Sequence, residues 1–262
     1  MVAVLVGDEK GAQDGGIQTG GAILIDCGMS GKQVMEALCK AGFDPRGIEA
    51  ILITHEHSDH IKGAGIVARK LGVPVYATPG TWAGMERALG ELPARQHVEI
   101  EAGQSFFLSH MEAAPFSIPH DAADPVGYRF FCGPHSVAVA TDLGYFAQNV
   151  CDAITGADVV LLESNHDPEL LKMNPHYPAR LKTRILGKKG HLSNDAGADA
   201  AVHLAQTGTH HLLLGHLSAE NNTPDLAYRV AHSALTGAGA QVGGDVSLHV
   251  AGRYQASYLY RV

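Results

Sequence analysis

The sequence has few cysteines, and no two of them stand at the spacing of a metal-binding or redox motif. The four are scattered along the chain. This pattern argues against both a disulfide framework and a cysteine zinc site, and it is typical of a protein from a reducing compartment. We therefore expect a cytoplasmic location. The cysteines are Cys27, Cys39, Cys132 and Cys151.

Long apolar runs and linkers are also missing from the 262 residues. No run approaches the ~20 residues of a membrane span, and the N-terminus lacks the pattern of a signal peptide. We expect a protein that is neither exported nor bound to a membrane. Because no Pro/Ser-rich or charged linker divides the chain, we predict a single domain over residues 1–262.

Positive charge is scarce, with 19 Lys and Arg against 27 Asp and Glu and a net charge of -8. This balance excludes a general nucleic-acid coat, so any binding of nucleic acid must be local. Histidine is abundant instead, with 16 residues. Most of these must be ordinary surface or core residues, but one stretch concentrates them.

That stretch begins where the apolar residues 51–53 indicate the end of a buried strand. His55 and His57 follow, and residues two apart in an extended segment share a face, so both imidazoles can bind one cation. Asp59 and His60 come where helical spacing begins and would point at a second position nearby. A solvated polar turn is the alternative, but four donors directly after a strand make a metal site the better interpretation.

Polar clusters follow other predicted strands as well. Apolar strands that alternate with helices, each with polar residues at its carboxyl end, indicate a layered α/β domain with one active edge. Helices are expected over about 33–41, 82–89, 195–207 and 224–235, a hairpin across residues 133–134, and a mobile loop over 7–21. The strand-end residues are Asp26, His120, Asp142, Glu163 and His216.

Five motifs together resemble the metallo-β-lactamase superfamily, and more closely its YycJ (WalJ) branch. The resemblance covers nearly the whole chain. In that branch a further strand and a Ser/Gly-rich loop normally precede the first motif, so we expect the start to be clipped. The motifs are residues 25–32, 55–63, 120–125, 163–167 and 216–222.

The resemblance implies an αββα sandwich with two divalent metals at its edge. Carried over residue by residue, the first metal is held by His55, His57 and His120. The second is held by Asp59, His60 and His216, and Asp142 bridges both. Histidine with carboxylate suits zinc, which we take as the first choice, with manganese and iron open.

The branch is implied to hydrolyse phosphodiesters, with 5'-to-3' DNA exonuclease activity, by a metal-bridging hydroxide. Two cations about 3.5–4 Å apart lower the pKa of water toward ~7 and clamp both oxygens of an in-line displacement. The partner would be a nucleic acid, DNA or RNA, or another phosphodiester. The oligomeric state is not predicted.

Other catalytic roles are also implied by the resemblance. Asp59, His191 and Glu163 are the predicted catalytic residues, with His191 donating a proton to the leaving oxygen and Glu163 as its partner. The alternative is that His191 only caps the following helix. Asp26 either orients a histidine ligand or makes a helix-start turn. Ser218, Asn221, Asn222 and His166 are candidate substrate-binding residues, although the first three also suit the turn before Pro224.

A local basic segment lies between two of these motifs. Residues 170–194 contain basic residues and no acid. A polyanionic substrate needs contacts with basic side chains. A solvated face is the alternative. No ladder of aromatic residues interleaves the basic ones, so extensive base stacking is not predicted. The predicted phosphate-binding residues are Arg180, Lys182, Arg184, Lys188 and Lys189.

Two other functions stay open at this point. A thioester or lactam hydrolase of the same fold would use the same metals but needs no acid-free segment. A non-catalytic metal-binding protein is the other, although structural zinc sites are four-coordinate and usually contain cysteine.

Overall fold

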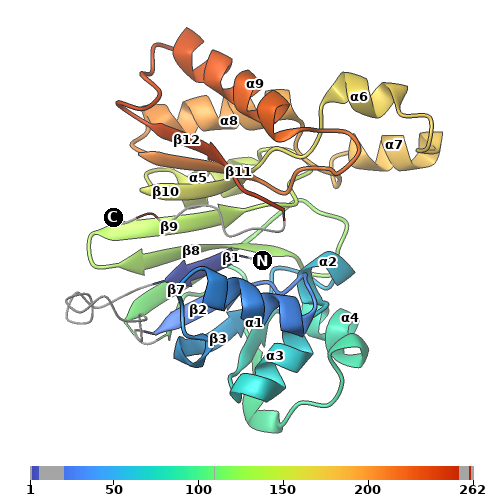
Figure 1. The fold of residues 1–262 in the computed structure, drawn as a ribbon, viewed down its shortest axis with the longest axis vertical. Coiled ribbons are helices and arrows are strands. Elements are labelled where there is room, and N and C mark those ends of the chain that lie inside the picture. The colour runs from blue at the N-terminus through green and yellow to red at the C-terminus, as the bar shows by residue number, and fades with distance from the viewer. Residues whose placement is uncertain (1, 6–20, 109, 254–259, 261–262) are drawn as a thin grey trace. The chain divides into compact units, whose positions relative to one another are not determined.

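The computed structural model describes residues 2–5, 21–108, 110–253 and 260 (Figure 1). They form two compact units. Unit 1 takes in residues up to 115 together with 122–126, and unit 2 takes in residues 116–121 and those from 127 onward. Whether the two make up one domain stays a prediction, and the expected loop over residues 7–21 falls almost wholly outside the described residues.

Unit 1 is built on a sheet with strand order β1-β2-β3-β4-β5. Strand β1 is antiparallel to β2, and the other neighbours are parallel. Parallel strands covered on both faces are nearly continuous apolar runs, as in the fully buried AILI of β2. The strands are β1 (Val2–Leu5), β2 (Ala22–Ile25), β3 (Ile48–Leu52), β4 (Val75–Ala77) and β5 (His97–Glu99).

The helices of unit 1 connect these strands and supply the other half of its core. Ser30 caps α1 in a capping box with Gln33, which satisfies orphan donors at both ends of that turn. Leu38, Val67 and Met85 pack against the strands. The helices are α1 (Gly31–Lys40), α2 (Ser58–Ile61), α3 (Ala64–Leu71) and α4 (Pro79–Leu89), and the short turns are η2 (Pro45–Gly47) and η3 (Ala94–Gln96). A hairpin of β6 (Phe106–Leu108) with β7 (Met111–Ser117) follows.

The second sheet has the strand order β12-β11-β10-β9-β8-β7-β6, and unit 2 holds most of it. In it β8 and β9 are antiparallel and β9 to β12 are parallel. The predicted hairpin across residues 133–134 is confirmed by the β8 to β9 pairing. All five residues of β10 are buried, including its last, Glu163. The strands are β8 (Val126–Cys132), β9 (His135–Ala140), β10 (Val159–Glu163), β11 (His211–Gly215) and β12 (Ser247–Val250).

Two long helices cover one face of this sheet, and three shorter helices lie in its connections. Each long helix begins with a hydroxyl cap, Ser193 for α8 and Thr223 for α9. Leu204 and Leu235 bury their side chains in the same core as Leu162 and Leu214. The helices are α5 (Gln148–Ile154), α6 (Pro168–Met173), α7 (Ala179–Ile185), α8 (Asn194–Gln206) and α9 (Pro224–Gly237).

Four predicted helices are present with bounds shifted by up to three residues, the largest shift being the start of α4 at Pro79. Helices α5, α6 and α7 were not predicted. They are six or seven residues long, and α7 buries none of its residues. A helix that buries no residues shows no apolar periodicity, so the sequence does not reveal it.

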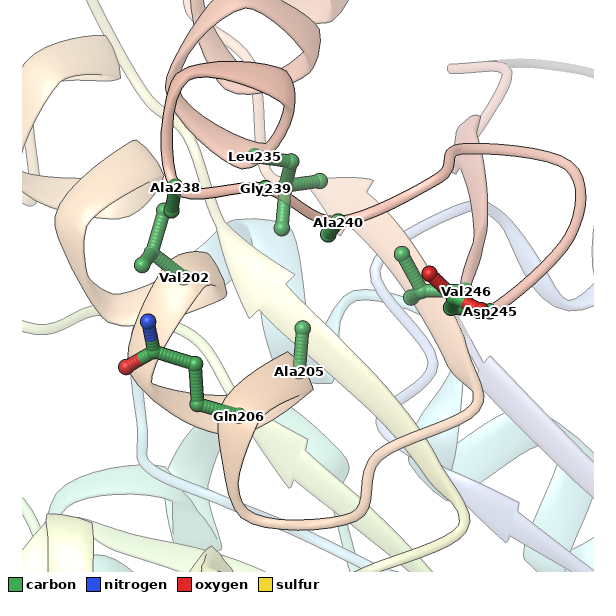
Figure 2. A pocket seen from close by; sticks show the side chains of 9 residues that line it. All are labelled: Val202, Ala205, Gln206, Leu235, Ala238, Gly239, Ala240, Asp245 and Val246. Carbon is green, nitrogen blue, oxygen red and sulfur yellow. The ribbon is translucent and has the colours of Figure 1, made fainter.

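Two further observations bear on where chemistry can occur. No helix among the described residues is both long and apolar enough to cross a membrane. A cavity of about 290 Å³ lies at the carboxyl end of α8, lined by Val202, Gln206, Leu235 and others (Figure 2). It contains no cluster of titratable groups, so the candidate site lies elsewhere.

Candidate active site

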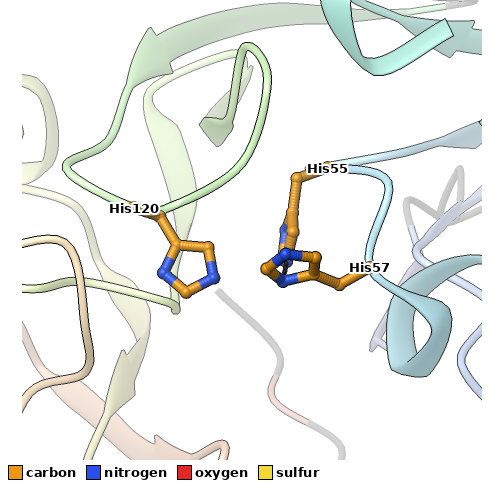
Figure 3. Close-up of side chains that lie close together, drawn as sticks. All are labelled: His55, His57 and His120. Atoms are coloured by element: carbon orange, nitrogen blue, oxygen red, sulfur yellow. Dashed lines mark hydrogen bonds between the residues drawn. The ribbon is translucent and has the colours of Figure 1, made fainter. Parts of the chain in front are cut away.

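One cluster of predicted ligands lies in unit 1, directly after β3. His55 and His57 come from the extended segment that follows this strand, and their rings meet edge to face, with centroids 4.6 Å apart (Figure 3). Nε2 of His55 lies 3.0 Å from Nδ1 of His57. Two imidazole nitrogens aimed at each other are the arrangement that a shared cation stabilises.

Asp26 and Thr54 hold the histidines of this unit in place. Asp26 accepts hydrogen bonds from the Thr54 amide (2.8 Å) and hydroxyl (2.9 Å), and Nδ1 of His60 donates to it at 2.8 Å. Nδ1 of His55 lies 3.0 Å from the Thr54 hydroxyl. Burial by itself would raise the pKa of Asp26, but His60 and the Thr54 amide lower it overall. The carboxylate therefore stays charged and fixes the ring of His60.

Asp59 is the most exposed of the predicted ligands in this unit. Its side chain is 67% exposed, and one carboxylate oxygen lies 3.7 Å from Nε2 of His60. His60 itself is buried. The helical turn α2 thus brings this carboxylate toward the outward nitrogen of the ring.

A separate cluster of predicted ligands lies in unit 2, in loops that follow β7, β9 and β11. His120 is buried after β7 (Figure 3), and its Nδ1 lies 3.1 Å from the carbonyl of Gly190. Asp142 and His216 have left-handed backbones, with φ of 61° and 56°. Non-glycine residues rarely adopt this conformation, and where they do the strain is often part of a functional site.

Glu163 joins two histidines of this unit. Its Oε1 accepts from Nδ1 of His191 (2.9 Å) and from Nδ1 of His216 (2.8 Å). Its Oε2 accepts from the amides of Leu143 (2.7 Å) and Leu192 (2.9 Å). Burial would raise the pKa of Glu163, yet the charge of His191 and the hydrogen bonds from His191 and His216 lower it to about 2. The carboxylate is therefore ionised at any physiological pH.

The same contact sets the charge of His191. Burial tends to lower the pKa of this imidazole, but the charge and hydrogen bond of Glu163 outweigh that tendency and raise it. His120, which is more deeply buried, has its pKa lowered by burial. The two rings therefore differ in charge, His191 tending to be protonated and His120 neutral.

The donor set fits divalent metal ions. A histidine ligand usually donates its second ring nitrogen to a fixed acceptor, which sets the tautomer and aims the ligand atom. Four predicted ligands have Nδ1 held in this way, which leaves Nε2 for a metal. In unit 2 alone, ligand atoms of Asp142, Glu163, His191 and His216 lie within 4.8 Å of one another. The four are His55, His60, His120 and His216.

Most predicted substrate-binding residues near β11 are buried and bonded within the protein. Asn222 donates to the carbonyls of Ser164 and Asn165, and Asn221 accepts from Asn174. The Ser218 hydroxyl accepts from the Asn221 amide at 3.2 Å and is part-exposed. These contacts build the turn before α9, which is the structural alternative that the sequence had left open.

His166 is also inside the protein. Its side chain is 1% exposed, and burial lowers its pKa to about 4. The backbone of His166 bridges to Ser193, next to the start of α8. This residue thus lies behind the site, and its role in substrate binding stays a prediction.

The basic segment forms α6, α7 and the turn that follows. Some of its charges have partners, since Arg184 pairs with Asp121 and Lys172 with Glu169. The ammonium of Lys182 donates to the Lys172 carbonyl at 2.6 Å. The predicted phosphate-binding residues therefore differ in how available their charges are to a phosphate, because Arg184 and Lys182 are already bonded to groups of the protein.

Several contributors were missed by sequence reasoning. Thr54 and Gly190 hold ligand rings through a hydroxyl and a carbonyl, and Gly144 allows the backbone of Lys188 to approach, since a Cβ there would lie 2.2 Å from the Lys188 carbonyl. Thr54 could have been found from its place directly before His55. The backbone contacts of Gly190 and Gly144 leave no such signal in the sequence.

Comparison with known proteins decides the family. Residues 22–217, three quarters of the chain, match the model of the Beta-lactamase superfamily domain. The chain belongs to this superfamily. The predicted metallo-β-lactamase fold and the class of metal-dependent hydrolase are thereby confirmed.

Within the superfamily, the chain belongs to the WalJ/YycJ branch, as the motifs predicted. It is 39% identical over 229 residues to Exodeoxyribonuclease WalJ of Streptococcus pneumoniae, covering 87% of this chain and 85% of that protein. It is 38% identical over 227 residues to Exodeoxyribonuclease YycJ of Bacillus anthracis, covering 87% and 86%. Zn(2+)-bound PqqB from Methylobacterium extorquens shares the fold, with a TM-score of 0.68 at 18% identity over 95% of this chain and 85% of that one.

Proposed function

We propose that this protein is a phosphodiesterase with two metal ions that shortens DNA from one end, in the 5'-to-3' direction. The observation that carries the proposal is the Glu163 carboxylate, which holds both a predicted metal ligand, His216, and a protonated imidazole, His191. Hydrolysis of a phosphodiester needs both a metal and a proton donor for the leaving oxygen. The names of the two curated relatives support DNA as the substrate.

The metal ligands are proposed as the superfamily pattern assigns them. His55, His57 and His120 hold one ion, Asp59, His60 and His216 hold the other, and Asp142 serves both. We propose zinc as the metal, with manganese or iron as alternatives that suit the same donors. When bound, two such ions lower the pKa of water and neutralise charge on the phosphate oxygens.

The protein's own groups then perform the proton chemistry. Nδ1 of His191 donates to Glu163, so Nε2 carries the second proton of the imidazolium. This proton goes to the oxygen of the departing nucleotide, and Glu163 keeps the ring charged until that moment. Asp59, whose carboxylate is exposed beside His60, is proposed to help orient the attacking water as well as to bind metal.

Substrate phosphates are proposed to lie along Arg180, Lys188 and Lys189, with Lys182 and Arg184 joining where substrate displaces their present partners. Lys188 and Lys189 are exposed and directly precede the Gly190–His191 pair. Ser218, part-exposed beside His216, is a further candidate for a phosphate oxygen. Asn221, Asn222 and His166 would support these loops from behind.

The location proposed for this chemistry is the cytoplasm. All four cysteines are free, which suits a compartment that keeps thiols reduced.

The test measures hydrolysis of bis-p-nitrophenyl phosphate beside a thioester and a cephalosporin, with metal content determined on the same sample. End-labelled DNA and RNA strands then give substrate and direction. We expect turnover of the diester and stepwise loss of nucleotides from the 5' end of DNA. Turnover of the thioester or cephalosporin alone would support a small-molecule hydrolase, and a metal-loaded protein inert on all of them would support a non-catalytic metal-binding protein.

A further inference from the structure

One aromatic side chain is exposed in the loop of Asp142, which connects β9 to α5 over residues 141–147. Leu143 and Ala147 bury their side chains in the core of unit 2, whereas Tyr145 between them is 48% exposed. Within the described part of the chain, the side chain of Tyr145 has no hydrogen-bond or ring partner. Single exposed apolar side chains are common on protein surfaces. What sets Tyr145 apart is therefore its surroundings.

Hydrogen bonds from backbone amides fix this loop, although its residues form no helix or strand. The Leu143 amide donates to Oε2 of Glu163 at 2.7 Å, and the Gly144 amide donates to the carbonyl of Pro119 at 2.9 Å. Glu163 is a proposed catalytic residue, and Pro119 directly precedes a proposed metal ligand. The backbone of Tyr145 is therefore held next to the proposed catalytic groups of unit 2.

Positive charge lies against the same loop. A Cβ on Gly144 would lie 2.2 Å from the carbonyl oxygen of Lys188, so the two backbones touch at a point where only glycine fits. Lys188 and Lys189 are both exposed. Because Tyr145 directly follows Gly144, an exposed aromatic ring and two exposed lysines come from backbone segments in contact with each other.

An aromatic ring beside two lysines suits a nucleotide. The π face of an aromatic side chain stacks on a nucleobase, and ammonium groups neutralise phosphates. A small diester without a base would use the lysines and leave the ring unused. An apolar protein surface would cover the lysines without offering a counter-charge, which costs free energy. One aromatic ring provides one stacking contact, in keeping with the lack of an aromatic ladder in the basic segment.

We infer that Tyr145 stacks on the nucleobase at the end of the strand that is cut, beside the phosphates proposed to lie on Lys188 and Lys189. The inference rests on the proposed function. A terminal nucleobase shows a face at the end of a single strand and at the end of a duplex alike, so this contact selects neither. Tyr145 holds the terminal nucleotide, and Asp142 and His191, on the adjoining segments, serve the phosphodiester bond that joins it to the next nucleotide.

The test combines a change in the protein with a change in the DNA. It measures the affinity of the metal-loaded protein for two 20-mer duplexes that phosphorothioate linkages protect from cleavage. One has a normal 5'-terminal nucleotide, and the other has an abasic one. Wild type should bind the abasic duplex about tenfold more weakly, as expected for one lost base stack. Tyr145→Leu should bind both duplexes equally, and Tyr145→Phe, which keeps the π face, should behave as wild type does.

Two controls separate stacking from a general effect on binding. Tyr228→Leu removes another exposed tyrosine, 36% exposed on α9, and should keep the tenfold difference. An abasic nucleotide in the middle of the strand should not weaken binding to wild type. Equal binding of the two duplexes by wild type, or a tenfold difference that persists in Tyr145→Leu, would overturn the inference. So would equal losses in the Leu and Phe variants at position 145, because the hydroxyl would then make the contact.

Failure of this inference can be told apart from failure of the proposed function. A protein that cleaves unmodified DNA but binds the normal and abasic duplexes equally would refute the role of Tyr145 alone. A protein that distinguishes the two duplexes through Tyr145 but cleaves no DNA would support the stacking contact and refute the nuclease.

Discussion

The imidazole of His191 lies against the carboxylate of Glu163, with Nδ1 2.9 Å from Oε1, across 28 positions of sequence. We expect His191→Ala to lower turnover by ~10²–10⁴ on a diester with a poor leaving group, the usual contribution of a general acid. With p-nitrophenolate as leaving group, which needs no proton, the loss should be small. Equal losses on the two substrates would leave His191 a positioning role only. His210→Ala, an exposed histidine, is the control.

The pH dependence of turnover should report the same contact. The active form of a general acid is the protonated one, present below its pKa, and Glu163 raises the pKa of His191 above the usual 6.5. Turnover of the poor-leaving-group substrate should therefore persist past that pH and fall only as pH rises through the raised value. In Glu163→Gln the fall should move to lower pH. An unmoved profile in that variant would show that another group titrates.

Metal content tests the proposed bridging role of Asp142. Freshly purified wild type should contain two metal ions per chain, because seven ligand side chains exceed what one cation with an open position needs. Asp142→Ala should lose both ions, since its carboxylate serves both, whereas Asp199→Ala, an exposed carboxylate on α8, should keep them. Elemental analysis that finds one ion or none in unchelated wild type would contradict the two-metal site.

Gly190 should tolerate no larger residue, because a Cβ there would lie 2.0 Å from the Ile185 carbonyl and 2.4 Å from that of Arg184. Backbone atoms cannot swing away as a side-chain end can. We expect Gly190→Ala to lower the free energy of unfolding by about 1–3 kcal/mol, as overpacking does. Gly237→Ala, at the end of α9 with no heavy atom within 4 Å, should be neutral or slightly stabilising. Urea denaturation with equal midpoints for the two variants would refute the clash.

Much of the site could be predicted because its residues stand at fixed places relative to apolar runs. His55, Asp142 and His216 each follow a buried strand, and the strand pattern is visible in the sequence. The fates of Asn221 and Asn222 could not be predicted, because their partners are Asn174 and the backbone near residues 164–165, about 50 positions away. Helices α6 and α7 were hidden because their exposed faces are not polar in the way that amphipathic periodicity requires.

The same limit applies to charge. Arg184 and Arg180 are equivalent in the sequence, yet Arg184 is paired with Asp121. Asp121 follows a different strand, 63 positions earlier. Only the tertiary fold separates a cation that is bonded to a carboxylate from one that is available to a phosphate.

Three residues have left-handed backbones that would mislead a protein engineer. They are Asp26, Asp142 and His216, with φ of 59°, 61° and 56°. An L-residue in that region costs about 1–2 kcal/mol, and glycine removes the cost. A search for stabilising substitutions by backbone preference would thus choose glycine at all three positions. It would delete the carboxylate that fixes His60, the proposed bridging carboxylate and a proposed metal ligand. In this enzyme, thermal stability has to be sought at other positions.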